Sequence, residues 1–376
     1  MKIVHIIVGL QTGGAETMLV RLIHGMPQHT HVVIALTTVG PLGEDLRGVG
    51  HSVHALGLNP WTAWRALPGL WRLIRQLRPD VVQTWMYHAD LLGGVIGRLA
   101  GVRNIVWNVR NTEIPQGRLS ATGLVIRLCA MLSGWLPRAI VCCAHAGVAK
   151  HAALGYRQSR MLVIPNGYDA EQWLPTDGSR DEARSAFALP REAFVVGIVG
   201  RYDPLKSYDV FVAAAARIAQ LARNAVFVMV GRQVDEGNQE LCRLIENTGG
   251  GASFRLLGER RDVARLMSAM DVYCLSSKAE GFPNVVAEAM LMQVPCVVTD
   301  VGDAARIVGP TGRVVPPGDP AALADAVVAL ERIGEGERRA VGRAARQRVV
   351  DHYGIEAVSR QYEQLYKRVR EQTGMS

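Results

Sequence analysis

The chain has 376 residues, of which 49% are hydrophobic and 20% charged, a balance typical of a globular protein and not of a disordered one. Two domains are expected at this length, each large enough to bury a core. No run of 18 or more apolar residues occurs, so the sequence predicts no membrane-spanning helix.

Positive charge is concentrated in the first half of the chain. Residues 1–170 contain 16 Lys/Arg and 7 Asp/Glu, whereas residues 171–376 contain 26 and 27, for a formal net charge of +8. A basic surface suits nucleic acid, anionic lipid or phosphate-bearing substrates, and charge alone does not choose among them. The six cysteines have no metal-ligand spacing and predict free thiols in a reducing compartment. We therefore expect a cytoplasmic protein, or one held peripherally on the inner face of the cell membrane.

The first half alternates short β-branched runs with longer amphipathic stretches. This alternation predicts a parallel sheet whose strands are joined by crossover helices, which is one Rossmann-like domain over residues 1–166. The predicted strands are 3–10, 31–36, 80–85, 104–109 and 139–144, and the predicted helices lie near 15–26, 61–77, 89–100 and 120–134.

A second series of the same kind predicts another doubly wound domain over residues 167–350. The segment 351–376 is an amphipathic helix by pattern, and it could pack back across the N-terminal domain. The predicted strands are 194–200, 225–231, 253–258, 271–277, 295–301 and 312–317, and the predicted helices lie near 208–221, 238–247, 262–268 and 284–292.

The expected fold class is therefore α/β, with two Rossmann-like doubly wound parallel-sheet domains facing a central cleft. Open parallel sheets bind ligands in the crevice at the carboxyl ends of their strands. If two such crevices face each other, a ligand is expected in the cleft that they share.

The most specific motif runs from Glu280 to Glu288. Pro283 suits the first turn of a helix, whose backbone N–H groups from residues 283–286 would face a diphosphate. Glu280 lies in the preceding loop, and Glu288 lies one turn beyond Asn284 on the same helix face, so that each carboxylate can bind hydroxyl groups. The alternative is a pair of solvated surface acids, which the apolar surroundings of Glu288 argue against.

Two further motifs follow predicted strands. Arg201 and Lys206, after Gly200, would lie at the carboxyl end of a strand, where two cations can neutralise a diphosphate leaving group. An exposed surface pair is the alternative. Gly13 and Gly14 follow the first strand and allow close approach of a ligand to the backbone, although a glycine turn is not specific by itself.

Together these motifs resemble the family-four glycosyltransferases (glycosyl transferases group 1), which are retaining enzymes of the GT-B fold. The resemblance covers nearly the whole chain. Its residues are Gly13-Gly14, Ile164 to Gly167, Gly200-Arg201 with Lys206, Val230-Gly231, Glu280 to Glu288, Thr311-Gly312 and Val315 to Asp319.

The resemblance implies a role for each of these site residues. Arg201 and Lys206 would bind the donor diphosphate, Glu280 would contact the transferred sugar, and Glu288 would hold the ribose hydroxyls. Arg201, Lys206 and Glu280 are thus the catalytic candidates. The donor-binding candidates are Gly14, Gly200, Gly258, Arg260, Gly281, Phe282, Pro283, Asn284, Val285 and Glu288.

The mechanism that the resemblance implies needs no protein nucleophile, because the leaving phosphate deprotonates the acceptor hydroxyl on the same face of the sugar. The sequence has no DxD motif, and two cations with a helix N-terminus can supply the electrostatic stabilisation that a metal would give. We expect no metal and no cofactor other than the nucleotide-sugar co-substrate.

The acceptor side departs from the family pattern. Many relatives place a histidine at the end of an N-terminal-domain strand, whereas this chain has Asn108 and Arg110 there, and either could substitute for it. His88 follows the strand at 80–85 and would face the cleft, either as an acceptor contact or as a neighbour of a helix cap.

The segment 61–78 combines three tryptophans with four arginines. Aromatic and basic residues on one amphipathic element suit an anionic membrane surface. The alternative is a helix that packs on its own sheet with solvated arginines.

The predicted function is transfer of a sugar, as a retaining and metal-independent hexosyltransferase, from a nucleotide-sugar to a saccharide or a lipid-diphosphate-linked saccharide. The pathway would be surface polysaccharide or glycoconjugate biosynthesis. We favour a UDP-sugar and leave GDP-sugars open. The alternatives are another GT-B-like enzyme, such as a sugar-nucleotide epimerase or an inverting transferase, and a basic nucleic-acid-binding protein. Neither zinc ligands nor an RNP-like strand is present, so no nucleic-acid partner is expected.

Overall fold

The computed structural model describes residues 1–374 except 12, 60, 111–119, 176–178 and 250–252. The chain divides into two compact units: Met1–Tyr168 together with the C-terminal segment from Ile355 form unit 1, and Asp169–Gly354 form unit 2. The divisions thus follow residues 168 and 354, where the sequence analysis placed boundaries after 166 and 350.

Unit 1 is built on a seven-stranded sheet with the order β3-β2-β1-β4-β5-β6-β7, in which every strand pair is parallel. β3 and β7, which are four and three residues long and partly exposed, were not predicted from the sequence. The strands are β1 Lys2–Ile7, β2 Thr30–Ala35, β3 Ser52–Ala55, β4 Val81–Trp85, β5 Ile105–Val109, β6 Ala139–Cys142 and β7 Met161–Val163.

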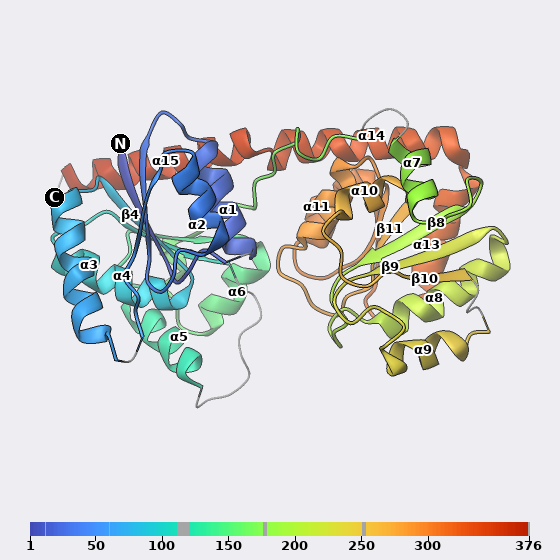
Figure 1. Ribbon diagram of the computed structural model, residues 1–376, viewed down its shortest axis with the longest axis horizontal. Helices are drawn as coiled ribbons and strands as arrows, with labels where there is room; N and C mark the ends of the chain where they lie inside the picture. The colour runs from blue at the N-terminus through green and yellow to red at the C-terminus, as the bar shows by residue number, and fades with distance from the viewer. Residues whose placement is uncertain (12, 60, 111–119, 176–178, 250–252, 375–376) are drawn as a thin grey trace. The chain divides into compact units, whose positions relative to one another are not determined.

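Helices cover both faces of this sheet (Figure 1). One face carries α3 (Ala63–Leu77), α4 (Tyr87–Leu99), α5 (Ala121–Leu132) and α6 (His145–Ala153). The other face carries α1 (Gly14–His24), α2 (Gly40–Gly48) and α15 (Ile355–Gly374). Among the described helices of the whole chain, none is both long enough and apolar enough to cross a bilayer.

The C-terminal helix α15 is part of the core of unit 1. Its Tyr362 and Tyr366 are fully buried, and the Asn108 side-chain amide donates to the Tyr362 hydroxyl at 3.0 Å. Close packing also needs the absence of a side chain at Gly167, where an added Cβ would lie 2.7 Å from Ile355 Cδ1. The helix that the sequence placed after residue 350 therefore completes the hydrophobic core of the N-terminal unit.

Unit 2 has a six-stranded parallel sheet with the order β10-β9-β8-β11-β12-β13. Its strands are β8 Phe194–Val199, β9 Ala225–Val230, β10 Phe254–Leu256, β11 Val272–Leu275, β12 Cys296–Thr299 and β13 Arg313–Val315. Its helices are α7 Ser179–Ala186, α8 Tyr208–Leu221, α9 Gln239–Glu246, α10 Val263–Ser268, α11 Asn284–Leu291, α12 Ala304–Val308, α13 Pro320–Arg332 and α14 Gly334–Tyr353.

In this unit α8, α9 and α13 pack on one face of the sheet around a single buried cluster. The strand order of both units is that of the doubly wound Rossmann arrangement, in which the chain moves outward in both directions from the first strand. The predicted fold class of two Rossmann-like parallel-sheet domains is confirmed.

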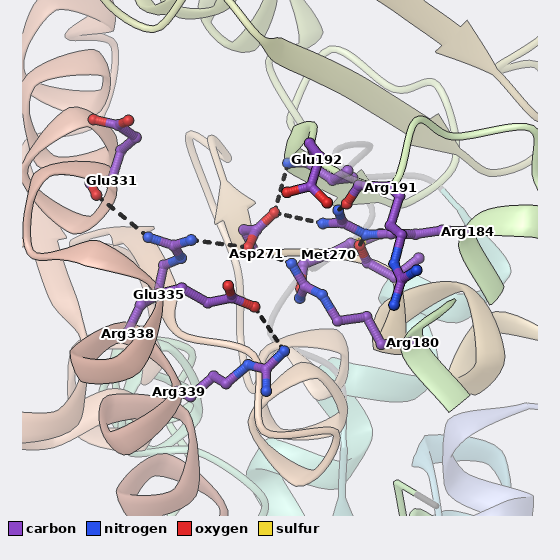
Figure 2. A network of polar contacts seen from close by, with 12 residues as sticks. Arg180, Arg184, Arg191, Glu192, Met270, Asp271, Glu331, Glu335, Arg338 and Arg339 are labelled. Atoms are coloured by element: carbon purple, nitrogen blue, oxygen red, sulfur yellow. Dashed lines mark hydrogen bonds and ion pairs between the residues drawn. The ribbon is translucent and has the colours of Figure 1, made fainter. Parts of the chain in front are cut away.

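A buried carboxylate, Asp271, joins several elements of unit 2 just before β11 (Figure 2). It accepts from Arg180 at 2.6 Å, from Arg184 at 2.7 Å, from Arg338 at 3.1 Å and from the Val195 N–H at 2.8 Å. Burial alone would raise the pKa of Asp271, but the arginines and this backbone donor together lower it. One carboxylate thereby ties α7, β8 and α14 to the start of β11.

A chain of hydrogen bonds runs through the core of unit 1 from Trp85 to the backbone of Met26. Trp85 Nε1 donates to His5 Nδ1 at 3.4 Å, His5 Nε2 lies 3.0 Å from His31 Nδ1, and His31 Nε2 lies 3.0 Å from the Met26 carbonyl oxygen. The Met26 carbonyl can only accept, so His31 carries a proton on Nε2. The Trp85 N–H can only donate, so His5 Nδ1 carries none. Each histidine therefore has its single proton on Nε2 and is neutral. Burial lowers the pKa of His31 to about 4 and that of His5 well below its ordinary value.

This pair makes the stability of unit 1 depend on pH. Between pH 7 and pH 5 the unfolded chain binds protons at both histidines, while the folded unit does not, so stability should fall as the pH falls. The expected loss is roughly 4 kcal/mol for the two groups together. Denaturant unfolding followed by tryptophan fluorescence at the two pH values measures it. His31→Gln should remove the contribution of one of the two histidines, about 2 kcal/mol, and His145→Gln at an exposed position of unit 1 should leave the difference unchanged. An unfolding free energy that is equal at both pH values would contradict the neutral pair.

Candidate functional site

The candidate site lies at the carboxyl ends of β8 and β11, which are paired neighbours in the sheet of unit 2. Residues 200–207 connect β8 to α8, and residues 276–283 connect β11 to α11. Since the strands are parallel, both connections leave the sheet at the same edge. The motif containing Arg201 and Lys206 is therefore brought together with the motif from Glu280 to Glu288 at this edge.

An ion pair links the two motifs. Lys206 Nζ donates to Glu280 Oε1 at 2.6 Å, and the same oxygen accepts from the Ser277 hydroxyl at 2.7 Å. The side chains of Lys206 and Glu280 are 24% and 11% exposed, so the pair is largely shielded from water and interacts strongly. An ammonium group has three N–H donors, and only one is needed for Glu280. The second carboxylate oxygen of Glu280 is not part of this pair.

The two connections are also joined through the backbone. The Ser276 hydroxyl donates to the Lys206 carbonyl oxygen at 2.8 Å, and the Lys278 N–H donates to the Leu205 carbonyl oxygen at 2.8 Å. Ser207, which precedes α8, has a φ of 52°, a left-handed conformation that a non-glycine residue adopts only where its surroundings enforce it. The position of Lys206 is therefore fixed by the chain on both sides of it.

Two glycines permit the close approach of neighbouring loops. An added Cβ at Gly231, where φ is 150°, would lie 1.8 Å from the Gly200 carbonyl oxygen. At Gly302, where φ is 57°, it would lie 2.4 Å from the Gly281 carbonyl oxygen, which also accepts from the Asp303 N–H at 2.9 Å. The backbone of each motif is thus in contact with a further connection of the sheet, the one after β9 at Gly200 and the one after β12 at Gly281.

Helix α11 begins at Asn284, so Pro283 is its N-cap residue and not part of the first turn as predicted. Pro283 has no N–H group, and the Val286 N–H donates to the Pro283 carbonyl oxygen at 3.1 Å. Of the four backbone positions predicted to contact phosphate, 283 and 286 are therefore excluded, and the Asn284 and Val285 amides are retained as candidates. Glu288 lies one turn further along α11 and is half-buried.

Arg201 is half-exposed and bound to its own loop. Its Nε donates to Asp203 at 2.9 Å, and the Leu205 N–H donates to the other carboxylate oxygen at 2.9 Å. The Leu205 N–H, more than the Arg201 side chain, lowers the pKa of Asp203. Asp203 thereby orients both Arg201 and the segment that leads to Lys206.

The remaining donor-binding candidates of unit 2 also have internal contacts. Gly258 donates its N–H to the Val234 carbonyl oxygen at 2.9 Å, so this N–H is not available for binding the donor. The Arg260 guanidinium donates two hydrogen bonds to the Asp262 carboxylate, at 2.7 and 2.8 Å, and this bidentate contact raises the pKa of Arg260. Phe282 packs edge-to-face on Tyr353 with ring centres 5.7 Å apart.

The candidates of unit 1 lie around the carboxyl ends of β1, β4 and β5. Gly14 opens α1, and His88 is the second residue of α4 and half-buried. Asn108 is fully buried, and its side chain also accepts from Arg110 at 3.1 Å. This burial argues against Asn108 as a sugar contact, because its amide is already bound to Tyr362 of α15.

Arg110 is half-buried and held from several sides. It donates to Asn166 of the Ile164–Gly167 motif and to the Tyr362 hydroxyl, and its guanidinium lies over the Trp85 ring at 5.5 Å from the ring centre. The Ile164–Gly167 motif therefore has a structural role, because its Asn166 helps to hold the Arg110 side chain.

Ser277, Ser276 and Gly302 were not singled out from the sequence. The signal that could have found the serines is the Ser-Ser pair that ends a buried strand, where small hydroxyl groups would face the neighbouring connection. Over the part of the chain that the structure describes, no three His, Cys, Asp or Glu side chains are grouped to hold a metal ion.

The comparisons with known proteins identify the family. A family model described as "Glycosyltransferase Family 4" matches residues 12–172, and one described as "Glycosyl transferases group 1" matches residues 193–332. Both units are thus covered by models of one class of enzyme. The chain belongs to the family-four glycosyltransferases of the GT-B fold.

Two curated relatives illustrate the range of the family. The chain is 28% identical over 63% of its length to UDP-Gal:alpha-D-GlcNAc-diphosphoundecaprenol alpha-1,3-galactosyltransferase of Escherichia coli. It is 31% identical over 64% of its length to phosphatidyl-myo-inositol mannosyltransferase of Mycobacterium leprae. The match spans 62% of the length of each relative.

Solved structures agree on the fold. The crystal structure of Anabaena HepE in complex with UDP superposes with a TM-score of 0.83 at 21% identity, over 97% of this chain and 99% of that one. The lipopolysaccharide glycosyltransferase WaaG superposes with a TM-score of 0.69 at 15% identity, over 96% and 98% of the two chains.

Proposed function

We propose that this protein transfers a sugar, with retention of configuration, from a UDP-sugar to a saccharide or lipid-diphosphate-linked saccharide acceptor. The observation that carries the proposal is the Lys206–Glu280 ion pair, which holds a cation and a carboxylate side by side at the edge of a nucleotide-binding type of sheet. Family membership supports the reaction class. The UDP-using galactosyltransferase with a lipid-diphosphate acceptor supports the choice of substrates.

In the proposed reaction, Lys206 and Arg201 neutralise the donor diphosphate as the bond between the anomeric carbon and the phosphate oxygen breaks. The acceptor oxygen bonds to the same face of that carbon, and its proton passes to a diphosphate oxygen of the leaving UDP. The Asn284 and Val285 amides and the dipole of α11 face the diphosphate. No protein nucleophile and no metal ion takes part.

Glu280 has a second task in this proposal. One of its carboxylate oxygens is fixed by Lys206 and Ser277, so the other can accept from hydroxyl groups of the transferred sugar. Because Lys206 would contact both Glu280 and the diphosphate, it couples the position of the sugar to the position of the leaving group. Glu288, one turn into α11, would accept from the two ribose hydroxyls.

The reaction is proposed to occur at the inner face of the cell membrane, in polysaccharide or glycoconjugate biosynthesis. The part of the sequence that supports a location at the membrane is the segment 61–78. Trp61 and Trp64 are 87% and 69% exposed, whereas Trp71 donates from Nε1 to the Leu99 carbonyl oxygen at 3.3 Å and is partly packed. Two of its three tryptophans are therefore available for a membrane.

Proton NMR of the reaction tests the proposal. The protein is incubated with UDP-glucose or UDP-galactose and EDTA, without an acceptor, and the released sugar is followed before mutarotation. An α-configured sugar with release of UDP is the expected result for a retaining, metal-independent enzyme. A β-configured sugar would contradict retention, and release that stops in EDTA would contradict metal independence.

A further inference from the structure

The outer surface of the helical layer formed by α3, α4 and α5 is unusually apolar. Its exposed large side chains are Trp61 (87%), Trp64 (69%), Leu99 (67%), Leu124 (58%), Met131 (78%) and Trp135 (62%), and we call these six residues the apolar surface. Single exposed apolar residues are ordinary, but a group of this size on one layer marks an interaction site.

Contacts between the segments show that part of this surface is continuous. Trp71 of α3 donates to the Leu99 carbonyl oxygen at the end of α4, and the Arg98 guanidinium lies 5.7 Å from the Trp135 ring centre, just after α5. The three helices lie side by side on one face of the sheet (Figure 1). Trp71 and Leu99 are 28 positions apart in the sequence, and Arg98 and Trp135 are 37 apart, so only the fold brings them together.

The exposed face of α5 has the same character along its length. Leu124 and Met131 are seven residues apart and therefore lie on one side of the helix, with exposed Arg127 between them. On α3, the Arg65 guanidinium lies 4.7 Å from the Trp64 ring centre. Apolar side chains with interspersed arginines are the composition of a helix that lies in a membrane interface.

The charge of the region selects an anionic partner. Residues 46–168 contain 14 Lys/Arg but only three Asp/Glu. Of these three, Asp90 is fully buried, Asp80 accepts from the Lys2 N–H at 2.7 Å, and Glu113 lies outside the described residues. Arg65, Arg98 and Arg127 lie among the residues of the apolar surface, and this part of the sequence supplies almost no compensating acid.

From this surface and charge we infer that the layer of α3, α4 and α5 docks on a bilayer of anionic phospholipid. The inference rests on the proposed function in that a lipid-linked acceptor is presented at a membrane. It also defines the contact beyond the 61–78 segment, because Leu124, Met131 and Trp135 belong to it. A membrane fits better than a nucleic acid, since leucine and methionine give no stacking surface for bases.

Flotation with vesicles tests the docking surface. Wild-type protein should float with vesicles of equimolar phosphatidylcholine and phosphatidylglycerol and not with phosphatidylcholine alone. The triple variant L124S/M131S/W135S should partition at least about tenfold less, because it removes apolar side chains from the interface. The matched control L174S/L221S/V314S changes three residues of unit 2 that are 57%, 50% and 43% exposed, and it should float like wild type.

Charge reversal provides a second arm. Arg127→Glu should lower partition by at least about fivefold, the change that corresponds to ~1 kcal/mol for one basic residue near an anionic surface. Arg223→Glu, at an exposed turn of unit 2, is its control and should have no effect. Circular dichroism confirms that each variant is folded.

Several results would overturn the inference. These are equal flotation of the triple variant and wild type, equal binding to neutral and anionic vesicles, or no vesicle binding together with binding of duplex DNA that Arg127→Glu abolishes. Calorimetric titration with UDP is run on the same samples. If wild type floats but does not bind UDP, the docking surface stands and the proposed function fails. If the triple variant binds UDP normally but does not float, both stand.

Discussion

Replacing Lys206 by alanine should lower kcat by roughly 10²–10³, the usual cost of removing one group that stabilises transition-state charge. Lys206 is fixed by the connection to α8 and by Glu280, and we assign it to the diphosphate charge that develops as the sugar leaves. The same change leaves Glu280 mostly buried without its cation, so binding of the sugar should weaken as well. Initial rates of UDP release at several donor concentrations separate the two effects.

Lys278 is a matched control for Lys206. It follows Ser276 and Ser277 in the connection from β11 to α11, is 51% exposed and pairs with Asp209 at 3.6 Å, which is a weak surface interaction. Lys278→Ala should keep wild-type rates. Equal kcat values for Lys206→Ala and Lys278→Ala would remove Lys206 from the proposed mechanism.

Replacing Asp271 by alanine should destabilise unit 2 by about 3–5 kcal/mol, the loss expected when one partner of a buried ion pair is removed. Arg184 has a side chain only 3% exposed and would lose its carboxylate partner, as would Arg338 at 11%. The Val195 N–H would lose its acceptor in the same substitution. Denaturant unfolding of the full chain at pH 7, with separate probes for the two units, measures this loss.

Asp181→Ala is the matched control for this network. Asp181 pairs with Arg191 at 2.9 Å beside the same cluster, but both side chains are more than half exposed, at 53% and 77%. Its removal should change the unfolding free energy by less than about 1 kcal/mol. A similar small effect for Asp271→Ala would mean that the arginines around it are stabilised by their backbone contacts and not by the carboxylate.

The sequence predicted the fold because most of its strands are buried and rich in β-branched residues. β8 and β9 stand out as apolar runs, and α8 was predicted with the bounds that the structure has. The short strands β3 and β7 and the helix α7 were not predicted. α7 is highly charged, and two of its charged residues, Arg180 and Arg184, find their partner in Asp271, which is distant in the sequence.

For the candidate site, the sequence located the two motifs but not the bonds between them. Spacing placed Glu280 before a helix and Lys206 after a strand, yet their direct contact depends on β8 and β11 being neighbours in the sheet although β9 and β10 lie between them in the chain. The same limitation explains Asn108. Its position at the end of β5 suggested a ligand contact, whereas α15, which is more than 240 residues away in the sequence, covers it.

Calorimetric titration with UDP, GDP, ADP and CMP in the presence of EDTA tests the central claim, a nucleotide-sugar donor site at the start of α11. We predict that UDP binds, and that Glu288→Ala weakens its binding by at least about tenfold through loss of charge-assisted hydrogen bonds to the ribose. Glu246→Ala, at an exposed position of α9, should bind UDP like wild type. Binding of none of the four nucleotides, or UDP binding that is unchanged in Glu288→Ala, would contradict the account.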